Sequence, residues 1–148
     1  MPSILLVAHA PLASALLAVA RHAYADCSRD VAAVDMPPSA GIDDATALVQ
    51  AALQQLPGPE VLVLVDAFGA TPSNAALAAV DGIRARVVTG INVPMVWRAL
   101  CYGHLPLGEL VTRAVDGGRQ GIMQVASPRR QNQPNRPASD DPEQRSDQ

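Results

Sequence analysis

Residues 61–72 read VLVLVDAFGATP and contain the strongest strand signal in the chain. The first five residues form a continuous run of Val and Leu, which is typical of a strand buried on both faces of a parallel sheet. Asp66 ends this run, and a tight loop follows at residues 67–70. Thr71 and Pro72 are residue types that begin helices. The segment therefore predicts a strand, a polar turn and then a helix that is capped by Thr71.

The same alternation of an apolar run and a helical segment occurs along the rest of the chain. The predicted strands are residues 4–8, 31–36, 61–65 and 86–89. The predicted helices are residues 12–25, 43–56, 72–80, 94–102 and 107–115, followed by a break at Gly117 and Gly118 and a short final strand at 122–125. Strands that alternate with helices favour parallel pairing through right-handed crossovers. We therefore expect an α/β fold, with an open, mainly parallel sheet in the order 2-1-3-4 and helices on both faces.

Composition divides the chain into one domain and a tail. Hydrophobic residues make up 49% of the 148 residues and aromatic residues only 3%, so the core must be aliphatic, as in helices packed on a parallel sheet. After Val125 the chain is almost entirely polar or proline, and such a segment cannot bury enough surface to offset the entropy of ordering. We expect a folded domain over residues 1–126 and a disordered tail over residues 127–148.

Charge and cysteine content exclude several classes of function. The net charge of −3 offers no basic stripe for nucleic acid. Cys27 and Cys101 show neither a metal-ligand spacing nor a CxxC motif, which indicates thiols in a reducing compartment. The apolar start of the chain lacks the preceding positive charge of a secretory signal, and no run approaches the ~20 apolar residues of a membrane span. We expect a cytoplasmic protein that neither inserts into a membrane nor binds nucleic acid.

Two side chains at neighbouring strand ends are the best candidates for chemistry. In open parallel sheets, ligands bind beyond the carboxyl ends of the strands, where the strand order reverses. In the order 2-1-3-4 this point lies between the first and third strands, which end at His9 and Asp66. A carboxylate against one imidazole nitrogen fixes the tautomer and leaves the other nitrogen free as a nucleophile. Asp35 lies in the second strand, and residues 89–92 are at the exit of the fourth.

The surroundings of this pair favour a phosphoryl group. Two predicted helices begin close to it, and the N-terminus of a helix binds anions through its free N–H groups. Ala10 follows His9 directly, and Gly69 and Ala70 allow backbone N–H groups to approach a ligand. Thr71 adds a hydroxyl. The predicted phosphate-binding residues are Ala10, Gly69, Ala70 and Thr71.

Other interpretations of these residues remain open or are weaker. A histidine at a strand end is often only a satisfied polar residue, and the same crevice in a non-catalytic α/β module would bind a small anion without chemistry. A histidine phosphatase needs an Arg beside its nucleophile, whereas His9 has alanines on both sides. A metal-dependent hydrolase needs several His, Cys or carboxylate ligands at one place, and His9, Asp35 and Asp66 offer few of them. The chain has no nucleophile elbow, P-loop or dinucleotide motif, and we expect no metal and no cofactor.

Three segments of the chain resemble a known protein family. They are residues 4–9 (ILLVAH), 63–76 (VLVDAFGATPSNAA) and 89–95 (TGINVPM). With their spacing, the chain resembles the mannose-type enzyme IIA domain of the bacterial phosphoenolpyruvate-dependent sugar phosphotransferase system over about residues 1–126. The family usually has glycine where this chain has Ala10 and Ala70, and a hydroxyl residue where it has Ala67.

The resemblance implies a phosphocarrier. His9 would correspond to the phosphorylated histidine, Asp66 to the aspartate that orients it, and Thr71 to a serine near the phosphate. The resemblance also implies that the histidine phosphocarrier HPr is the donor. It further implies a homodimer in which a short antiparallel edge strand, here residues 120–126, is exchanged between subunits.

The destination of the phosphoryl group stays open at this point. No IIB-like segment follows, so we expect the acceptor to be a separate IIB subunit in sugar uptake, or the phosphorylation state to act as a regulatory signal. A lone domain with a tail favours regulation slightly. The sequence specifies neither the sugar, nor the acceptor, nor the role of the tail.

Overall fold

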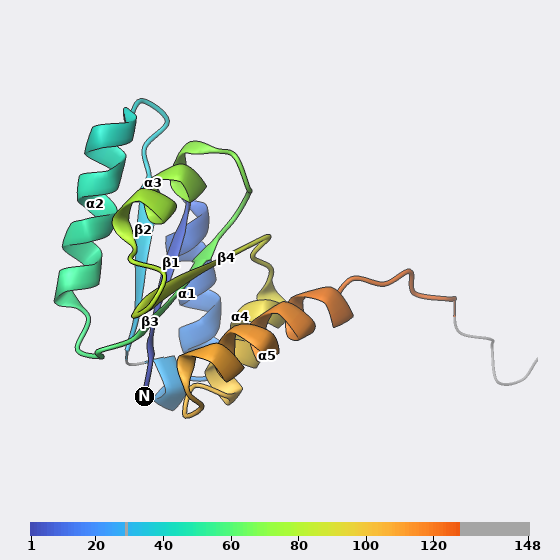
Figure 1. Cartoon of the computed structure of the whole chain (residues 1–148). Helices are drawn as coiled ribbons and strands as arrows, with labels where there is room; N and C mark the ends of the chain where they lie inside the picture. The colour runs from blue at the N-terminus through green and yellow to red at the C-terminus, as the bar shows by residue number, and fades with distance from the viewer. Residues whose placement is uncertain (29, 128–148) are drawn as a thin grey trace, which may run out of the picture.

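The computed structural model describes residues 1–28 and 30–127 and contains one parallel sheet. Its strands are β1 (Ser3–His9), β2 (Val31–Met36), β3 (Val61–Val65) and β4 (Ala85–Thr89). All three pairings are parallel and the order is β2-β1-β3-β4 (Figure 1). The predicted α/β fold and strand order are confirmed. The predicted tail falls on residues 128–148, apart from its first residue, and these lie outside the described residues.

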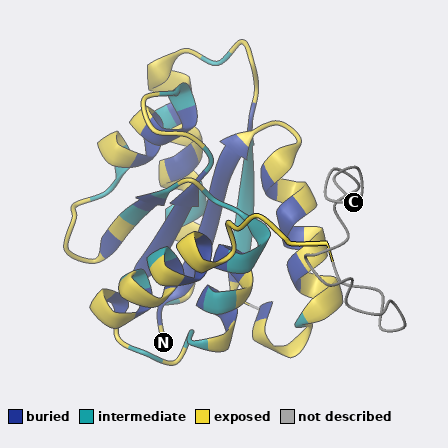
Figure 2. Ribbon diagram, turned by 90° about the vertical axis from the view of Figure 1, so that its right-hand side faces the viewer, coloured by how far each residue is buried: buried dark blue, intermediate teal, exposed yellow. Residues whose placement is uncertain are grey.

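Helices cover both faces of the sheet, as the alternating pattern predicts. One face carries α1 (Leu12–Ala23), α4 (Val93–Cys101) and α5 (Leu107–Gln120), with the short turn η1 (Asp26–Ser28) beside them. The opposite face carries α2 (Ile42–Gln55) and α3 (Thr71–Ala79). Figure 2 shows the strands as a buried layer between helices whose outer surfaces are exposed.

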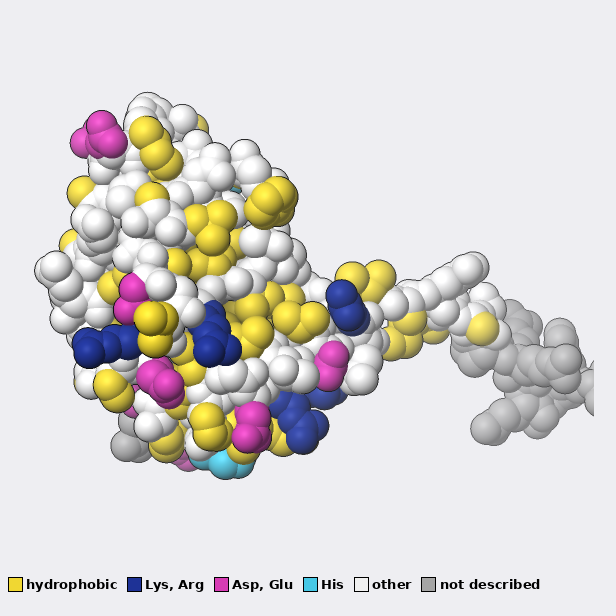
Figure 3. Space-filling model, in the orientation of Figure 1, with side chains coloured by type: hydrophobic (Ala, Val, Ile, Leu, Met, Phe, Trp, Pro, Cys, Tyr) yellow, Lys and Arg dark blue, Asp and Glu magenta, His cyan; other side chains and the backbone are white. Residues whose placement is uncertain are grey.

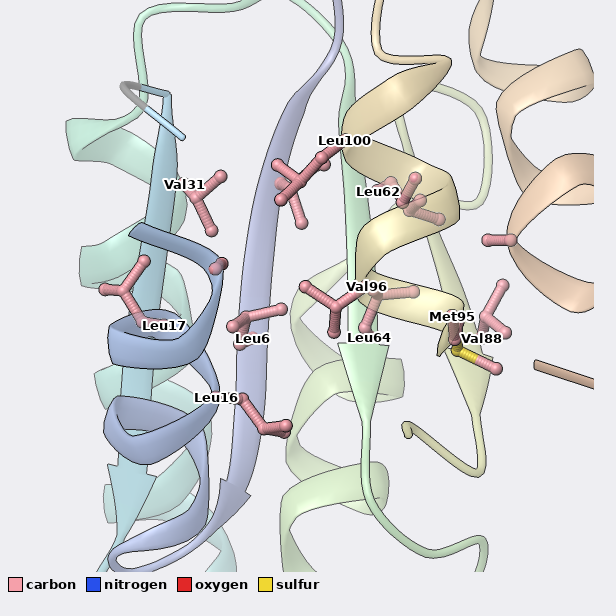
Figure 4. Close-up of a cluster of buried hydrophobic side chains, with 14 of the residues drawn as sticks. Leu6, Leu16, Leu17, Val31, Leu62, Leu64, Val88, Met95, Val96 and Leu100 are labelled. Atoms are coloured by element: carbon pink, nitrogen blue, oxygen red, sulfur yellow. The ribbon is translucent and has the colours of Figure 1, made fainter. Parts of the chain in front are cut away.

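The aliphatic strands supply two separate cores. Alternate residues of a strand point to opposite faces, so Leu6 and Leu64 pack with Leu16 and Val96 from the α1 and α4 side (Figure 4). The intervening strand residues of β1 and β3 pack against α2 and α3. All five residues of β3 are buried, which accounts for its unbroken apolar sequence. Each such side chain contributes about 1.5–3 kcal/mol relative to exposure.

The pairing register brings two carboxyl ends together. Val7 of β1 lies opposite Val65 of β3, so the chain leaves both strands at the same level of the sheet. His9 is the last residue of β1, and Asp66 follows β3 directly. The reversal of strand order between β1 and β3 therefore places these two residues beside each other, as predicted.

The prediction of a helix break at Gly117 and Gly118 is wrong. Helix α5 continues through both glycines to Gln120. The glycines serve close packing instead, because a Cβ at Gly117 would lie 2.5 Å from the Cβ of Arg98. A Cβ at Gly118 would lie 2.7 Å from the Cε of Met95. Helices α4 and α5 approach each other through these positions.

Two smaller predictions also differ from the structure. Residues 122–125, which were expected to form a strand, have no regular secondary structure, and nothing within the described residues pairs with them. A strand needs a hydrogen-bonded neighbour, and this segment extends away from the sheet (Figure 1). Thr71 does not cap α3: Ala70 is the N-cap residue, and no side chain bonds to the first turn. No helix among the described residues has the length and apolar character needed to cross a membrane.

The close approach of α4 and α5 gives a stability test. We expect Gly117→Ala to lower the free energy of unfolding by about 1–2 kcal/mol, because the clash with Arg98 outweighs the gain in helix propensity. Gly108→Ala is the matched control in the same helix, since its Cβ would meet only the flexible end of Arg86 at 3.3 Å. Urea unfolding measures both variants, and equal stability of the two would contradict the packing role.

Candidate active site

His9 and Asp66 form a short hydrogen-bonded pair at the carboxyl end of the sheet. The Nδ1 atom of His9 lies 2.6 Å from Oδ2 of Asp66. The backbone N–H of His9 donates to the same oxygen at 3.0 Å, and the N–H of Ala67 donates to Oδ1 at 2.9 Å. The His9 side chain is 54% exposed, whereas that of Asp66 is 13% exposed. Backbone N–H groups thus fix the carboxylate of Asp66, while the imidazole of His9 faces solvent.

The environment of Asp66 keeps it ionised. Burial alone would raise the pKa of this carboxyl group. Hydrogen bonds from the His9 backbone, from the His9 side chain and from the Ala67 backbone, together with the charge of His9, outweigh that effect and lower the pKa. An ionised carboxylate only accepts hydrogen bonds, so in the neutral ring the nitrogen facing it carries the proton. The other ring nitrogen, Nε2, then presents a lone pair on the exposed side.

The loop between β3 and α3 begins at Asp66, and the N–H of its first residue, Ala67, bonds to the Asp66 carboxylate. Gly69 has a φ of 82°, a left-handed conformation in which a side chain would be strained. This turn directs the chain from Asp66 into α3, where Thr71 is the first helical residue and is half-buried. The first N–H groups of a helix have no partner within it. The predicted phosphate-binding residues Gly69, Ala70 and Thr71 therefore lie together at the N-terminus of α3.

Ala10 does not present a free donor, in contrast to the sequence-based expectation. Its N–H donates to the carbonyl oxygen of Met36 at 3.0 Å. The backbone immediately after β1 continues the pairing with β2 by one more bond, and this consumes the N–H that was expected to face an anion.

Asp35 has a role that the sequence analysis did not find. Its Oδ1 accepts the N–H of Ser14 at 2.9 Å, in the first turn of α1. Helix α1 has no acidic residue in its first turn and no side-chain cap of its own. Asp35 therefore substitutes for a cap from the adjacent strand. Two features of the sequence could have predicted this role. Asp35 is an acidic residue near the end of β2, and the start of α1 has no capping side chain.

Asn92, which follows β4 closely, caps one helix and joins it to another. The Oδ1 atom of Asn92 accepts the N–H of Met95 at 2.9 Å and so caps α4. Its Nδ2 donates to the carbonyl of Gly118 at 3.1 Å, which ties α4 to α5. Both polar groups of this side chain are thereby used within the helical layer.

Comparisons with known proteins identify relatives of the whole described domain. The family model described as "PTS system fructose IIA component" matches residues 3–115. No curated protein sequence matches the chain.

Solved structures give the same assignment. The mannose/sorbose specific IIA subunit of the phosphotransferase system from Enterococcus faecalis is 28% identical, with a TM-score of 0.78, and the match covers 86% of this chain and 96% of that one. The PTS IIA protein associated with the fucose utilization operon from Streptococcus pneumoniae is 25% identical, with a TM-score of 0.64 and coverages of 78% and 93%. The phosphotransferase system component EIIA from Streptococcus agalactiae, at 22% identity and a TM-score of 0.75 over 84% and 97% of the two chains, shows the shared fold.

The ionised Asp66 gives a pH-dependent stability test. Because its pKa is lower in the folded chain than in the unfolded chain, its charge stabilises the fold above the unfolded-state pKa. That contribution is lost as the pH falls through the folded-state pKa. We expect Asp66→Asn to lower stability at pH 7 by about 1–2 kcal/mol through weaker hydrogen bonds, with the difference from the unmodified protein shrinking in acid.

Denaturant unfolding across this pH range measures the effect. Asp116→Asn serves as the control, since Asp116 is an exposed carboxylate on α5. A stability difference for Asp66→Asn that stayed constant with pH would contradict the assigned charge state.

Proposed function

The chain belongs to the mannose-type enzyme IIA family of the phosphotransferase system, and from this premise we propose that it is a phosphocarrier whose phosphoryl group is carried on Nε2 of His9. The donor in this proposal is HPr. The acceptor is a separate IIB subunit, or the phosphorylated state itself acts as a regulatory signal. The observation that carries the proposal is the 2.6 Å contact between Nδ1 of His9 and Asp66.

The contact explains which nitrogen would react. Asp66 holds the proton on Nδ1, so the lone pair of Nε2 is available at the exposed edge of the ring. In the transfer, this lone pair attacks the phosphorus of a donor phosphohistidine, a P–Nε2 bond forms, and the P–N bond of the donor breaks. The donor nitrogen recovers the bonding electron pair.

Asp66 also balances the charge that the reaction creates. When Nε2 gives its lone pair to phosphorus while Nδ1 keeps its proton, the ring becomes positively charged. The carboxylate 2.6 Å away is already ionised and desolvated, so it stabilises this charge without reorganising. The bonds broken and formed are alike, and the protein therefore needs to contribute mainly positioning and electrostatics.

The N-terminus of α3 would hold the phosphoryl oxygens. In the proposal, the N–H groups of Gly69 and Ala70 and the hydroxyl of Thr71 bind them, with the positive end of the α3 dipole behind. Gly69 retains the turn, which supports the loop geometry even though the chain has Ala70 at a position that is usually glycine in the family. The N–H of Ala10 could bind a phosphoryl oxygen only if its hydrogen bond to the carbonyl oxygen of Met36 broke.

We propose that the protein is a homodimer formed through its last described residues. Strand β4 lies at one edge of the sheet. A groove of about 490 Å³ runs beside it, between β4 and α5, and Ile122 lines its end. Ile122, Met123 and Val125 are 75%, 68% and 80% exposed. Hydrophobic side chains gather on this face of the molecule (Figure 3). Residues 120–126 of a second copy, added to β4, would cover both the edge and these side chains.

The phosphocarrier proposal predicts labelling at one residue. Incubation with phosphoenolpyruvate, enzyme I and HPr should place one acid-labile phosphoryl group per chain, which mass spectrometry of peptides maps to His9. His9→Ala should abolish the label, and Asp66→Ala should slow labelling roughly 10²-fold because the tautomer is no longer fixed. His22→Ala and His104→Ala are matched controls that should label normally, whereas label on either of these histidines would refute the assignment.

The dimer proposal predicts a dependence on residues 122–125. Light scattering during size-exclusion chromatography should give twice the mass of one chain. The double variant Ile122→Asp and Val125→Asp should give a monomer, because charges at these positions cannot be buried in the interface. Leu77→Asp, at an exposed leucine of α3, should remain dimeric. A monomeric unmodified protein would rule the interface out.

A further inference from the structure

Two cysteines that are distant in the sequence share one cavity at the amino end of the sheet. Cys27 lies in η1, and Cys101 is the last residue of α4. Both line a cavity of about 220 Å³, together with Ile4 at the start of β1. Helix α4 packs against η1, and in Figure 1 the short light-blue turn lies beside the N-terminus and the lower end of the α4 and α5 pair.

Both side chains are accessible as thiols. Cys27 and Cys101 are free cysteines, and both are exposed. Within the part of the chain that the structure describes, no group of three or more His, Cys, Asp or Glu side chains could hold a metal ion. Two accessible thiols that line one cavity can be oxidised. The first oxidation product of a thiol is a sulfenic acid, and a second thiol nearby converts it into a disulfide.

Tyr24 interacts with both cysteines. The pKa of Tyr24 is raised, first through its side-chain interaction with Cys101 and the charge of that residue, then by burial and by the charge of Cys27. Both cysteines therefore lie within electrostatic reach of the same phenol. A phenol that keeps its proton can donate it to a neighbouring thiolate, which is the reactive form of cysteine.

We propose that Cys27 and Cys101 form a reversible intramolecular disulfide when the protein meets a peroxide. In the first step one thiol loses its proton, the resulting thiolate attacks a peroxide oxygen, the O–O bond breaks, and the departing hydroxide takes up that proton, which gives a sulfenic acid and one water. In the second step the other thiol loses its proton, its sulfur attacks the sulfenic sulfur, an S–S bond forms, the S–O bond breaks, and the departing hydroxide takes up the second proton and leaves as water. The two thiols lose two electrons and two protons, and hydrogen peroxide accepts them.

The cross-link would act at the end of the molecule opposite the candidate active site. Strand β1 begins beside the cysteine cavity and ends at His9. The disulfide would join the segment between α1 and β2 to the end of α4, and so would clamp the helical layer that contains α1 and α4. It would leave His9, Asp66 and the loop before α3 untouched, while restricting the unfolded chain through a long closed loop.

The test uses the full chain and hydrogen peroxide as the probe. Before oxidation, maleimide should label two thiols per chain, and after oxidation none. The intact protein should lose the mass of two hydrogen atoms, remain free of intermolecular cross-links on a non-reducing gel, and yield a peptide that joins Cys27 to Cys101. Dithiothreitol should restore both thiols, and the oxidised form should melt at a higher temperature.

Single variants separate a cross-link from independent oxidation. Cys27→Ser and Cys101→Ser should each gain oxygen atoms on the remaining cysteine instead of losing hydrogen, and neither should show the rise in melting temperature. The proposal is overturned if both thiols still react with maleimide after peroxide treatment, or if the only disulfide joins two chains. It is also overturned if each cysteine of the unmodified protein gains oxygen atoms as the remaining cysteine does in the single variants. None of these outcomes depends on phosphoryl transfer.

Discussion

The proposed phosphocarrier function depends on the hydrogen bond between Asp66 and His9. One carboxylate oxygen accepts both the side-chain and the backbone N–H of His9, so a single group fixes the end of β1 and the orientation of the ring. Burial of the carboxylate would favour its neutral form, and the hydrogen bonds overcome that tendency. The result is an exposed imidazole whose Nδ1 faces the carboxylate, so that in the proposed reaction the nucleophile is Nε2. A mobile histidine at the same place would lack this orientation.

The parallel sheet brings His9 and Asp66 into contact, because the strands that end at these residues are neighbours. Parallel strands in the order β2-β1-β3-β4 end at one edge, and the order reverses between β1 and β3, which is where open sheets of this kind bind ligands. The aliphatic layers on both faces hold the strands in register, and the register sets the level at which His9 and Asp66 leave the sheet. Asp35 and Asn92 bind the starts of α1 and α4 to this frame.

The sequence predicted the sheet and the central pair because both follow from strong local patterns. Val61–Val65 is apolar without interruption, and a polar residue directly after such a run must lie at the strand end. The errors arose where tertiary packing overrides a local pattern. Gly117 reads as a helix break, yet it lies within α5 because Arg98 occupies the space of a side chain. Ala10 reads as a free donor, yet its N–H extends the pairing with β2, which no local pattern reveals.

The state of the His9 ring tests this account most directly. Nitrogen NMR of the protein labelled with ¹⁵N-histidine distinguishes the two neutral tautomers and the charged ring at a pH where His9 is neutral. The account predicts a proton on Nδ1 and an unprotonated Nε2, with this preference lost in Asp66→Ala. A neutral ring protonated on Nε2 in the unmodified protein would contradict it, because no lone pair would then face the donor.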